Sequence, residues 1–256
     1  MRSLRLALPC LALLLAAACA STQEKPVSFT DDARSNLAKG SEALEGKQYA
    51  EAEAYFEEVR TKYPFLEEAK LAELRLADLD FSRDRYAEAR DRYLAFVKAH
   101  PSHASVDYAA FQAAVTHTKD MPTEVFFLPP ASEKDQVEVK LAYDALGNFL
   151  KQFPGSKYEG EARKLYDDVR RRLAQHELYV ARFYTKRERW PAVVRRLETL
   201  LEAYPGSPME EEALFRLYEA YDRLHDKAKA QETLQRVLSR LPGTPAAERA
   251  RKLLGT

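Results

Sequence analysis

The side chains that most often carry enzyme chemistry form no catalytic pattern in this chain. Its five histidines are scattered, and the closest pair, His100 and His103, lies across a proline turn. Such an H-x-x-H pair lacks the helical face that a zinc site needs. No serine has the sequence context of a nucleophile elbow, and the carboxylates alternate with basic residues as they do on solvated helix faces. We therefore expect no enzyme activity, no metal site and no cofactor.

Cys19 is the residue whose type and position predict a modification. Two arginines precede an apolar stretch from Leu6 to Ala18, which is too short to span a bilayer comfortably. This start resembles a bacterial lipoprotein signal, in which the cysteine becomes lipidated and then N-terminal, although Ala16 stands where that signal usually has leucine. The alternative is an ordinary secretory signal that is cleaved after Ala18.

We expect residues 1–18 to be a removable signal peptide, and residues 19–30 to be a lipidated cysteine with a flexible tether. A lipidated Cys19 carries more than one acyl chain, which stable anchoring requires. Ala20 and Ser21 follow it. By resemblance to lipoprotein sorting in enterobacteria, these residues imply the outer membrane, with the protein lipid-anchored on its periplasmic face.

The net charge and its distribution along the chain indicate which kinds of partner this protein can bind. Lys and Arg number 40, as do Asp and Glu, so the net charge is zero, which disfavours a general nucleic-acid binder. The balance is uneven, because residues 163–196 hold 11 basic and four acidic side chains. A basic stretch on a neutral protein suggests an acidic partner. The alternative is a set of helix-surface arginines without a partner.

A repeated pattern must position these residues. Five segments end at a proline, and each has apolar residues 12, 8 and 5 positions before it, spacings that follow one face of an α-helix. The prolines are Pro64, Pro101, Pro154, Pro205 and Pro242. The apolar residues are Ala52, Phe56 and Val59; Ala89, Tyr93 and Phe96; Ala142, Leu146 and Phe149; Val193, Leu197 and Leu200; and Ala230, Leu234 and Val237.

The first repeat, residues 31–64, has the length of a tetratricopeptide repeat, which it resembles. Gly40, Ala77 and Ala181 match the small first-helix residue of that repeat. We predict an all-α fold for residues 31–256, a right-handed α-solenoid of five tetratricopeptide-like helix pairs plus a short C-terminal helix. The pairs are expected at about 31–65, 66–102, 103–155, 156–206 and 207–243.

Two features depart from the regular repeat. Residues 119–136 form an insertion with three prolines and the apolar run Val125–Leu128. We expect it to pack on the third repeat, the alternative being that it presents a ligand. Glu159 to about Lys186 is predicted to be one long helix. Ser156 with Glu159, and Ser207 with Glu210, predict capping boxes.

Residues 173–205 resemble the fourth repeat of the BamD family, lipoproteins of the outer-membrane β-barrel assembly machinery. The resemblance rests on the run Glu177–Arg187, on Trp190 and on Ala192-Val193-Val194, and it extends from Phe29 to about Leu254. It implies a scaffold whose C-terminal half binds the barrel insertase BamA. It also implies that the N-terminal half binds unfolded outer-membrane proteins, and that other Bam lipoproteins are partners.

The resemblance also implies site residues. The docking arginine of the family matches Arg196, and Arg195 adds a second charge beside it. Reversing the charge of Arg196 is expected to weaken the insertase contact without unfolding the protein, because surface charge swaps usually alter stability little. Tyr49, Tyr86 and Tyr108 are the candidates for a substrate groove lined by first-helix side chains.

Two alternative functions remain open from the sequence. One is a different periplasmic tetratricopeptide scaffold that coordinates cell-envelope proteins, resembling the Tol-Pal-associated proteins, which usually carry an N-terminal coiled coil that is absent here. The other is a lipoprotein enzyme with a helical-repeat domain. The repeats fill the chain, which disfavours a separate catalytic domain.

Overall fold

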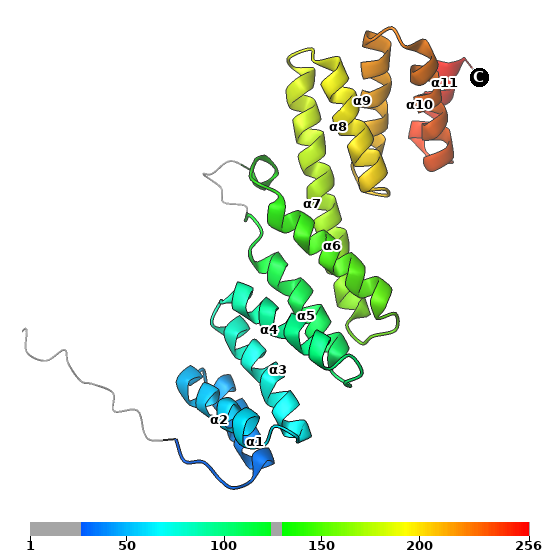
Figure 1. The fold of residues 1–256 in the computed structure, drawn as a ribbon. Coiled ribbons are helices and arrows are strands. Elements are labelled where there is room, and N and C mark those ends of the chain that lie inside the picture. The colour runs from blue at the N-terminus through cyan, green and yellow to red at the C-terminus, as the bar shows by residue number, and fades with distance from the viewer. Residues whose placement is uncertain (1–26, 124–129, 256) are drawn as a thin grey trace, which may run out of the picture.

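A computed structural model describes residues 27–123 and 130–255, and this part of the chain is all-helical (Figure 1). The helices are α1 (Ala33–Glu45), α2 (Tyr49–Lys62), α3 (Glu67–Ser82), α4 (Tyr86–Ala99), α5 (Val106–Lys119), α6 (Val137–Gln152), α7 (Glu159–Thr185), α8 (Trp190–Ala203), α9 (Glu210–Arg223), α10 (Lys227–Arg240) and α11 (Pro245–Leu254). A short 3₁₀ helix, η1 (Ala131–Glu133), precedes α6. The prediction of an all-α fold with five helix pairs and a C-terminal helix is confirmed.

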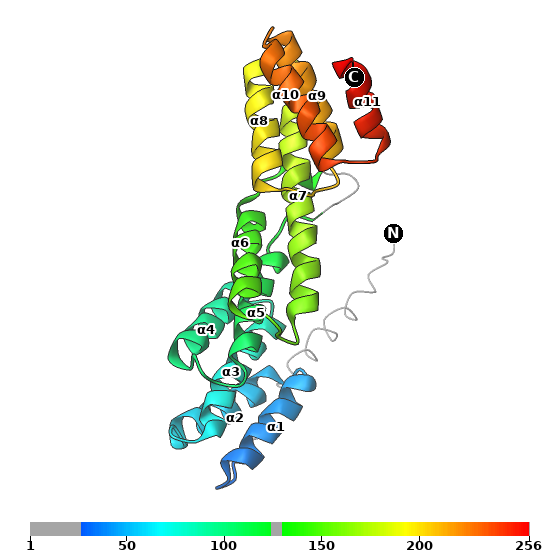
Figure 2. The same cartoon turned by 90° about the vertical axis from the view of Figure 1, so that its right-hand side faces the viewer.

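The helices stack in chain order into an elongated array (Figures 1 and 2). Each helix packs on the helices that precede and follow it, and α1 also touches α3. The long helix α7 has 27 residues, about 40 Å at 1.5 Å per residue. It runs beside α6 in its first half and beside α8 in its second, so it joins the two halves of the array. The prediction of one long helix here is confirmed.

The apolar residues that recur before each proline form the interior. All of the positions 12, 8 and 5 residues before the five prolines are buried, with at most 5% of each exposed. Gly40, Ala77 and Ala181 are buried as well. The interior consists of three clusters along the array. This is the arrangement expected when each helix buries its apolar face against its neighbours in sequence.

The prolines explain why every second helix ends where it does. The residue before each proline has φ between −125° and −128° and ψ between 48° and 58°, outside the helical region. The proline ring clashes with a helical conformation at the preceding residue. The five residues are Tyr63, His100, Phe153, Tyr204 and Leu241. The same junction therefore recurs along the chain.

The turns inside the helix pairs share a second conformation, which the sequence did not reveal. In four pairs, the residue two positions before the second helix is left-handed, with φ between 53° and 59°, and none of these residues is glycine. They are Lys47, Asp84, Glu188 and His225. The identities of these four residues do not predict a left-handed conformation, because glycine is the residue that normally adopts it.

The predicted capping boxes need a correction. Helices α7 and α9 begin at Glu159 and Glu210, three residues after the serines that were expected to cap them. A turn intervenes, in which the Glu159 N–H donates to the Ser156 carbonyl at 2.9 Å. Glu159 and Glu210 instead accept hydrogen bonds from the N–H groups of Gly155 (2.8 Å) and Gly206 (2.9 Å).

Gly40→Ala is expected to destabilise the protein by about 1–3 kcal/mol, the usual cost of overpacking. A Cβ at Gly40 would lie 2.7 Å from Cε1 of Phe56, where α1 crosses α2. The matched control is Gly160→Ala on α7, because no atom lies within 4 Å of the added methyl. That change is expected to stabilise by about 0.5–1 kcal/mol. Urea unfolding of both variants measures the difference, and equal midpoints would contradict this account of the α1–α2 contact.

Candidate functional site

Tyr49 and Tyr86 lie at the turns inside the first two helix pairs. They are the first residues of the second helices, α2 and α4, rather than residues of a first helix. The Tyr49 hydroxyl donates to the Ser82 carbonyl at 3.1 Å, and the Tyr86 hydroxyl donates to the Asp84 carboxylate. The hydrogen bond to Asp84 raises the pKa of Tyr86. The two tyrosines therefore occupy equivalent places in successive repeats.

Tyr108 lies elsewhere, on α5, and belongs to a buried polar network. Its hydroxyl donates to Oδ1 of Asp78 at 2.8 Å, and the Tyr93 hydroxyl donates to the same oxygen at 2.6 Å. Arg75 donates to Oδ2 at 2.6 Å. Burial raises the pKa of Tyr93 and of Tyr108, and the negative charge of Asp78 raises both further. The network ties α3, α4 and α5 together.

A second buried carboxylate stands beside the first on α3. Asp80 is 3% exposed and pairs with Arg85 at 2.5 Å and with Arg92 at 2.7 Å. The sequence analysis missed both aspartates as structural residues. A signal was present, since Asp78 and Asp80 are the only polar residues in the segment 76–81 of α3, where an unpaired carboxylate is costly.

Tyr93→Phe is expected to lower stability by about 1.5–3 kcal/mol, the range for a hydrogen bond to a charged group. The change leaves the buried Asp78 without one of its donors. The control is Tyr49→Phe, which removes a bond to an exposed backbone carbonyl and should cost about 0.5–1 kcal/mol. Thermal or urea unfolding compares the two. An equal loss in both variants would mean that Asp78 does not depend on Tyr93.

Arg195 and Arg196 project differently from α8. The Arg195 side chain is exposed, and its guanidinium has no hydrogen-bond or ion-pair partner among the described residues. Arg196 donates from Nη1 to Oε2 of Glu177 on α7 at 3.2 Å, and its side chain is 42% exposed. The Glu177 side chain is only 5% exposed. Arg196 is therefore the surface partner of a buried carboxylate.

This contact changes the expectation for charge reversal. A glutamate at position 196 would face Glu177, and the buried carboxylate would lose its cation. Breaking a buried pair on one side is destabilising, because it leaves an uncompensated charge. We therefore now expect Arg196→Glu to lower stability as well as to weaken any partner contact. The effect of the change on partner binding stays a prediction.

Four of the nine other cations in residues 163–196 pair with carboxylates, and all four lie on α7. Arg163, Arg170 and Arg171 bind carboxylates of their own helix, and Arg182 binds Glu212 of α9. Arg172 donates to the carbonyl of Pro122 at 3.1 Å. Local pairing neutralises most of the cations on α7, so the basic stretch is interrupted along this helix.

An aromatic–cation cluster lies near the turn from α7 to α8. The Arg187 guanidinium stacks 3.5 Å from the centroid of the Phe183 ring, and Phe183 is 40% exposed. Trp190 is half-buried against the core, and Arg223 lies 5.6 Å from its ring centroid. Trp190 therefore has a packing role at this turn. The sequence analysis missed the Phe183–Arg187 pair, although its four-residue spacing places both side chains on one helix face.

The ends of the insertion contact α7, in the fourth pair rather than the third. His176 Nδ1 lies 2.7 Å from the Ser132 carbonyl oxygen, and the Arg172 contact with Pro122 comes from the other end. The expected packing on the third repeat is thus incomplete as an account of this segment. The apolar run Val125–Leu128 lies outside the described residues.

Within residues 27–123 and 130–255, no three His, Cys, Asp or Glu side chains lie close enough together to hold a metal ion. His100 instead contacts Glu73 at 2.8 Å, and His103 contacts Glu67. None of the described helices is long and apolar enough to cross a membrane. Cys19 lies outside the described residues.

Comparison with known proteins identifies relatives of this chain. Residues 31–238 match the family model YfiO, described as outer membrane lipoprotein. The chain is similar to "Outer membrane protein assembly factor BamD" of three organisms. The protein of Rickettsia prowazekii is 30% identical over 188 residues, 73% of this chain and 72% of the relative. That of Haemophilus influenzae is 27% identical, covering 76% and 75%. That of Neisseria gonorrhoeae is 25% identical, covering 91% and 89%.

Among solved structures, that described as "TPR2AB-domain:pHSP90-complex of yeast Sti1" aligns with 87% of this chain and 84% of that chain. The TM-score is 0.44 and the sequence identity is 11%.

Proposed function

This chain belongs to the YfiO family of outer membrane lipoproteins, and we propose that it is an assembly factor for outer membrane proteins. Relatives of similar length carry that name. In this proposal, the protein is a non-enzymatic scaffold on the periplasmic face of the outer membrane, held there by a lipidated Cys19. It binds a BamA-like insertase and unfolded outer-membrane proteins, beside other Bam lipoproteins. Holding client and insertase together raises their effective concentration, so no chemical step is needed.

The Arg196–Glu177 pair is the observation that carries the insertase contact. A guanidinium has five N–H donors, and the contact with Glu177 uses one nitrogen of a side chain that is 42% exposed. Donors that remain available can bind a partner carboxylate in the bidentate manner typical of arginine. Because Glu177 already holds the cation in place, docking costs little side-chain entropy.

Binding of unfolded outer-membrane proteins, the clients in this proposal, requires a second surface. Outer-membrane proteins carry aromatic strand ends, and a helical array offers a long surface on which an extended segment can bind. Tyr49, Tyr86 and Tyr108 are each half-buried, so part of each ring stays accessible. We propose them as candidate contacts for aromatic client residues, with Tyr49 and Tyr86 acting at two equivalent turns.

Arg196→Gln is expected to raise the dissociation constant for the insertase about tenfold, equivalent to about 1.4 kcal/mol. Glutamine keeps an N–H donor for Glu177 but loses the charge that a partner carboxylate needs. Titration of the detergent-solubilised insertase against the tagged lipoprotein measures the change. Arg195→Gln shows whether the adjacent exposed arginine shares this contact. The control for loss of an exposed charge is Lys98→Gln on α4, in the half of the array that is not proposed to bind the insertase.

A double variant separates docking from folding. Glu177→Gln added to Arg196→Gln removes the buried charge, so any loss of stability in the single variant should be recovered while insertase binding stays weak. Recovery of binding together with stability would mean that Arg196 acts only through folding. Unchanged insertase capture by a variant with both Arg195 and Arg196 replaced by glutamine would exclude this contact. Capture of Tol-Pal proteins instead would favour the alternative scaffold function.

Cys19→Ala is expected to release the protein from the membrane fraction into the soluble periplasm, because the acyl chains are its proposed anchor. Fractionation of cell envelopes, followed by immunoblotting, measures the distribution. The same experiment in cells depleted of the insertase controls for retention by a protein partner. Full retention of the variant in depleted cells would contradict lipid anchoring through Cys19.

A further inference from the structure

The turn between α2 and α3 carries two exposed apolar side chains. Phe65 is 97% exposed and Leu66 is 45% exposed. They follow Pro64, at the junction that ends the first helix pair. A phenylalanine that touches almost nothing in its own chain contributes little to folding, so its apolar surface is available to an external partner.

The other four junctions show that the turn itself does not require these residues. The two residues after the proline are Ser102-His103, Gly155-Ser156, Gly206-Ser207 and Gly243-Thr244. All of these are polar or glycine, although the residue before each proline adopts nearly the same backbone conformation as Tyr63. The Phe-Leu pair is therefore particular to the first junction.

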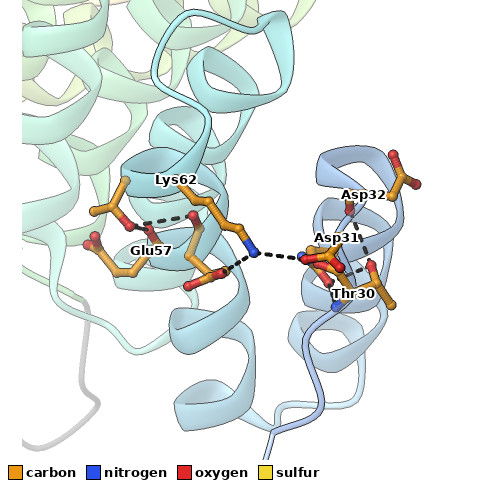
Figure 3. Close-up of polar contacts among 8 residues, drawn as sticks. Thr30, Asp31, Asp32, Glu57 and Lys62 are labelled. Atoms are coloured by element: carbon orange, nitrogen blue, oxygen red, sulfur yellow. Dashed lines mark hydrogen bonds and ion pairs between the residues drawn. The ribbon is translucent and has the colours of Figure 1, made fainter.

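The first junction lies where the chain enters the array. Lys62, the last residue of α2, pairs with Asp31 at 3.2 Å, and Arg34 of α1 pairs with Glu68 of α3 at 3.6 Å. Figure 3 shows Lys62 reaching from α2 to Asp31, just before α1 begins. These two contacts flank the turn that carries Phe65, so the turn and the start of α1 form one end of the molecule.

The entering segment is held firmly against this end. The buried Asn36 accepts from the Thr30 N–H and donates to the Thr30 carbonyl, both at 2.8 Å. The Tyr55 hydroxyl donates to the Ser28 carbonyl at 3.1 Å, and the Phe29 ring packs edge-on against Tyr55. Phe29 itself is 44% exposed. The point at which the chain leaves the described structure is thereby fixed relative to Phe65.

Chain length limits how far this end can lie from a lipid attached at Cys19. Eight peptide units separate Cys19 from Val27, and they can span at most about 29 Å in any conformation. The helix α7 alone is about 40 Å long, so the limit applies to the first helix pair and its junction rather than to the C-terminal half.

The charges beside the turn do not oppose approach to a lipid surface. Lys62 contacts Asp31 and Glu58, Lys70 contacts Glu67, and Arg34 contacts Glu68. These three cations face four carboxylates, so most of the charge at the rim of the turn is neutralised and a net charge of −1 remains. Phe and Leu side chains on the apolar face of a peripheral segment bury in the boundary between lipid headgroups and acyl chains.

We propose that Phe65 and Leu66 insert into the lipid surface to which the proposed Cys19 anchor ties the chain. The inference rests on the lipid anchoring in the proposed function. Two points of attachment, the acyl chains and the apolar turn, set the tilt of the solenoid on the membrane. The anchor alone would leave that tilt undetermined.

Brominated lipid tests the insertion directly. Trp190 is the only tryptophan, so a Trp190→Phe background carrying Phe65→Trp reports on position 65 alone. The full-length lipidated protein is reconstituted in vesicles of phosphatidylethanolamine and phosphatidylglycerol, with and without bromine on the acyl chains. The Trp emission is expected to shift to the blue on reconstitution and to lose most of its intensity in brominated vesicles. The control is Leu224→Trp in the same background, a partly exposed apolar position at the α9–α10 turn.

Vesicle flotation distinguishes the two ways in which the idea can fail. Protein that floats with the vesicles but shows no quenching at position 65 would overturn the insertion and leave the anchor intact. Equal quenching at positions 65 and 224 would also overturn it, because the α2–α3 turn would then contact the acyl chains no more than the α9–α10 turn does. Protein that fails to float would overturn the lipid anchor and the insertion together.

Discussion

Each helix of this protein depends on its neighbours in sequence to bury its apolar face. The residues 12, 8 and 5 positions before each proline are buried between adjacent helices, and the interior is a series of clusters rather than one central core. Nearest-neighbour packing of this kind makes stability a sum of local contacts. The prolines add the second part of the constraint, because each forces the preceding residue out of the helical region and ends a pair at a fixed phase. The surface can then vary from junction to junction without a change of fold.

Buried carboxylates pair with arginines and favour particular contacts between neighbouring helices. Asp78, Asp80 and Glu177 are nearly inaccessible, and each is paired with an arginine that remains partly exposed. A carboxylate buried without a cation is destabilising, so helix registers that separate Asp80 from Arg92, or Glu177 from Arg196, are disfavoured. The pairing also presents arginines at defined places on the surface. In the proposed function, Arg196 combines both roles, since it compensates Glu177 and offers its other donors to the insertase.

The two ends of the array have different proposed functions, membrane contact at the N-terminal end and insertase binding in the C-terminal half. The N-terminal pair is held by the segment 28–32 and carries the apolar turn at Phe65, while α7 extends the array away from it. The C-terminal half carries Arg196 and the Phe183–Arg187 pair. Because α7 is one continuous helix, the spacing between these regions is set by its length rather than by a loop. A membrane contact at one end would thus fix the height and direction of the other.

The sequence by itself determined the helical class, the five pairs, the long helix α7 and the buried positions, because helical periodicity and proline sterics act within a few residues of one another. It also pointed to Arg196 through a resemblance. Only the tertiary structure decided what Arg196 touches, that Tyr108 is tied to Asp78, that Tyr49 and Tyr86 lie at turns, and that the insertion ends reach α7. These contacts join residues 19 to 50 positions apart. They depend on the angle and offset between helices, which arise from the packing of many side chains and leave no local pattern in the sequence.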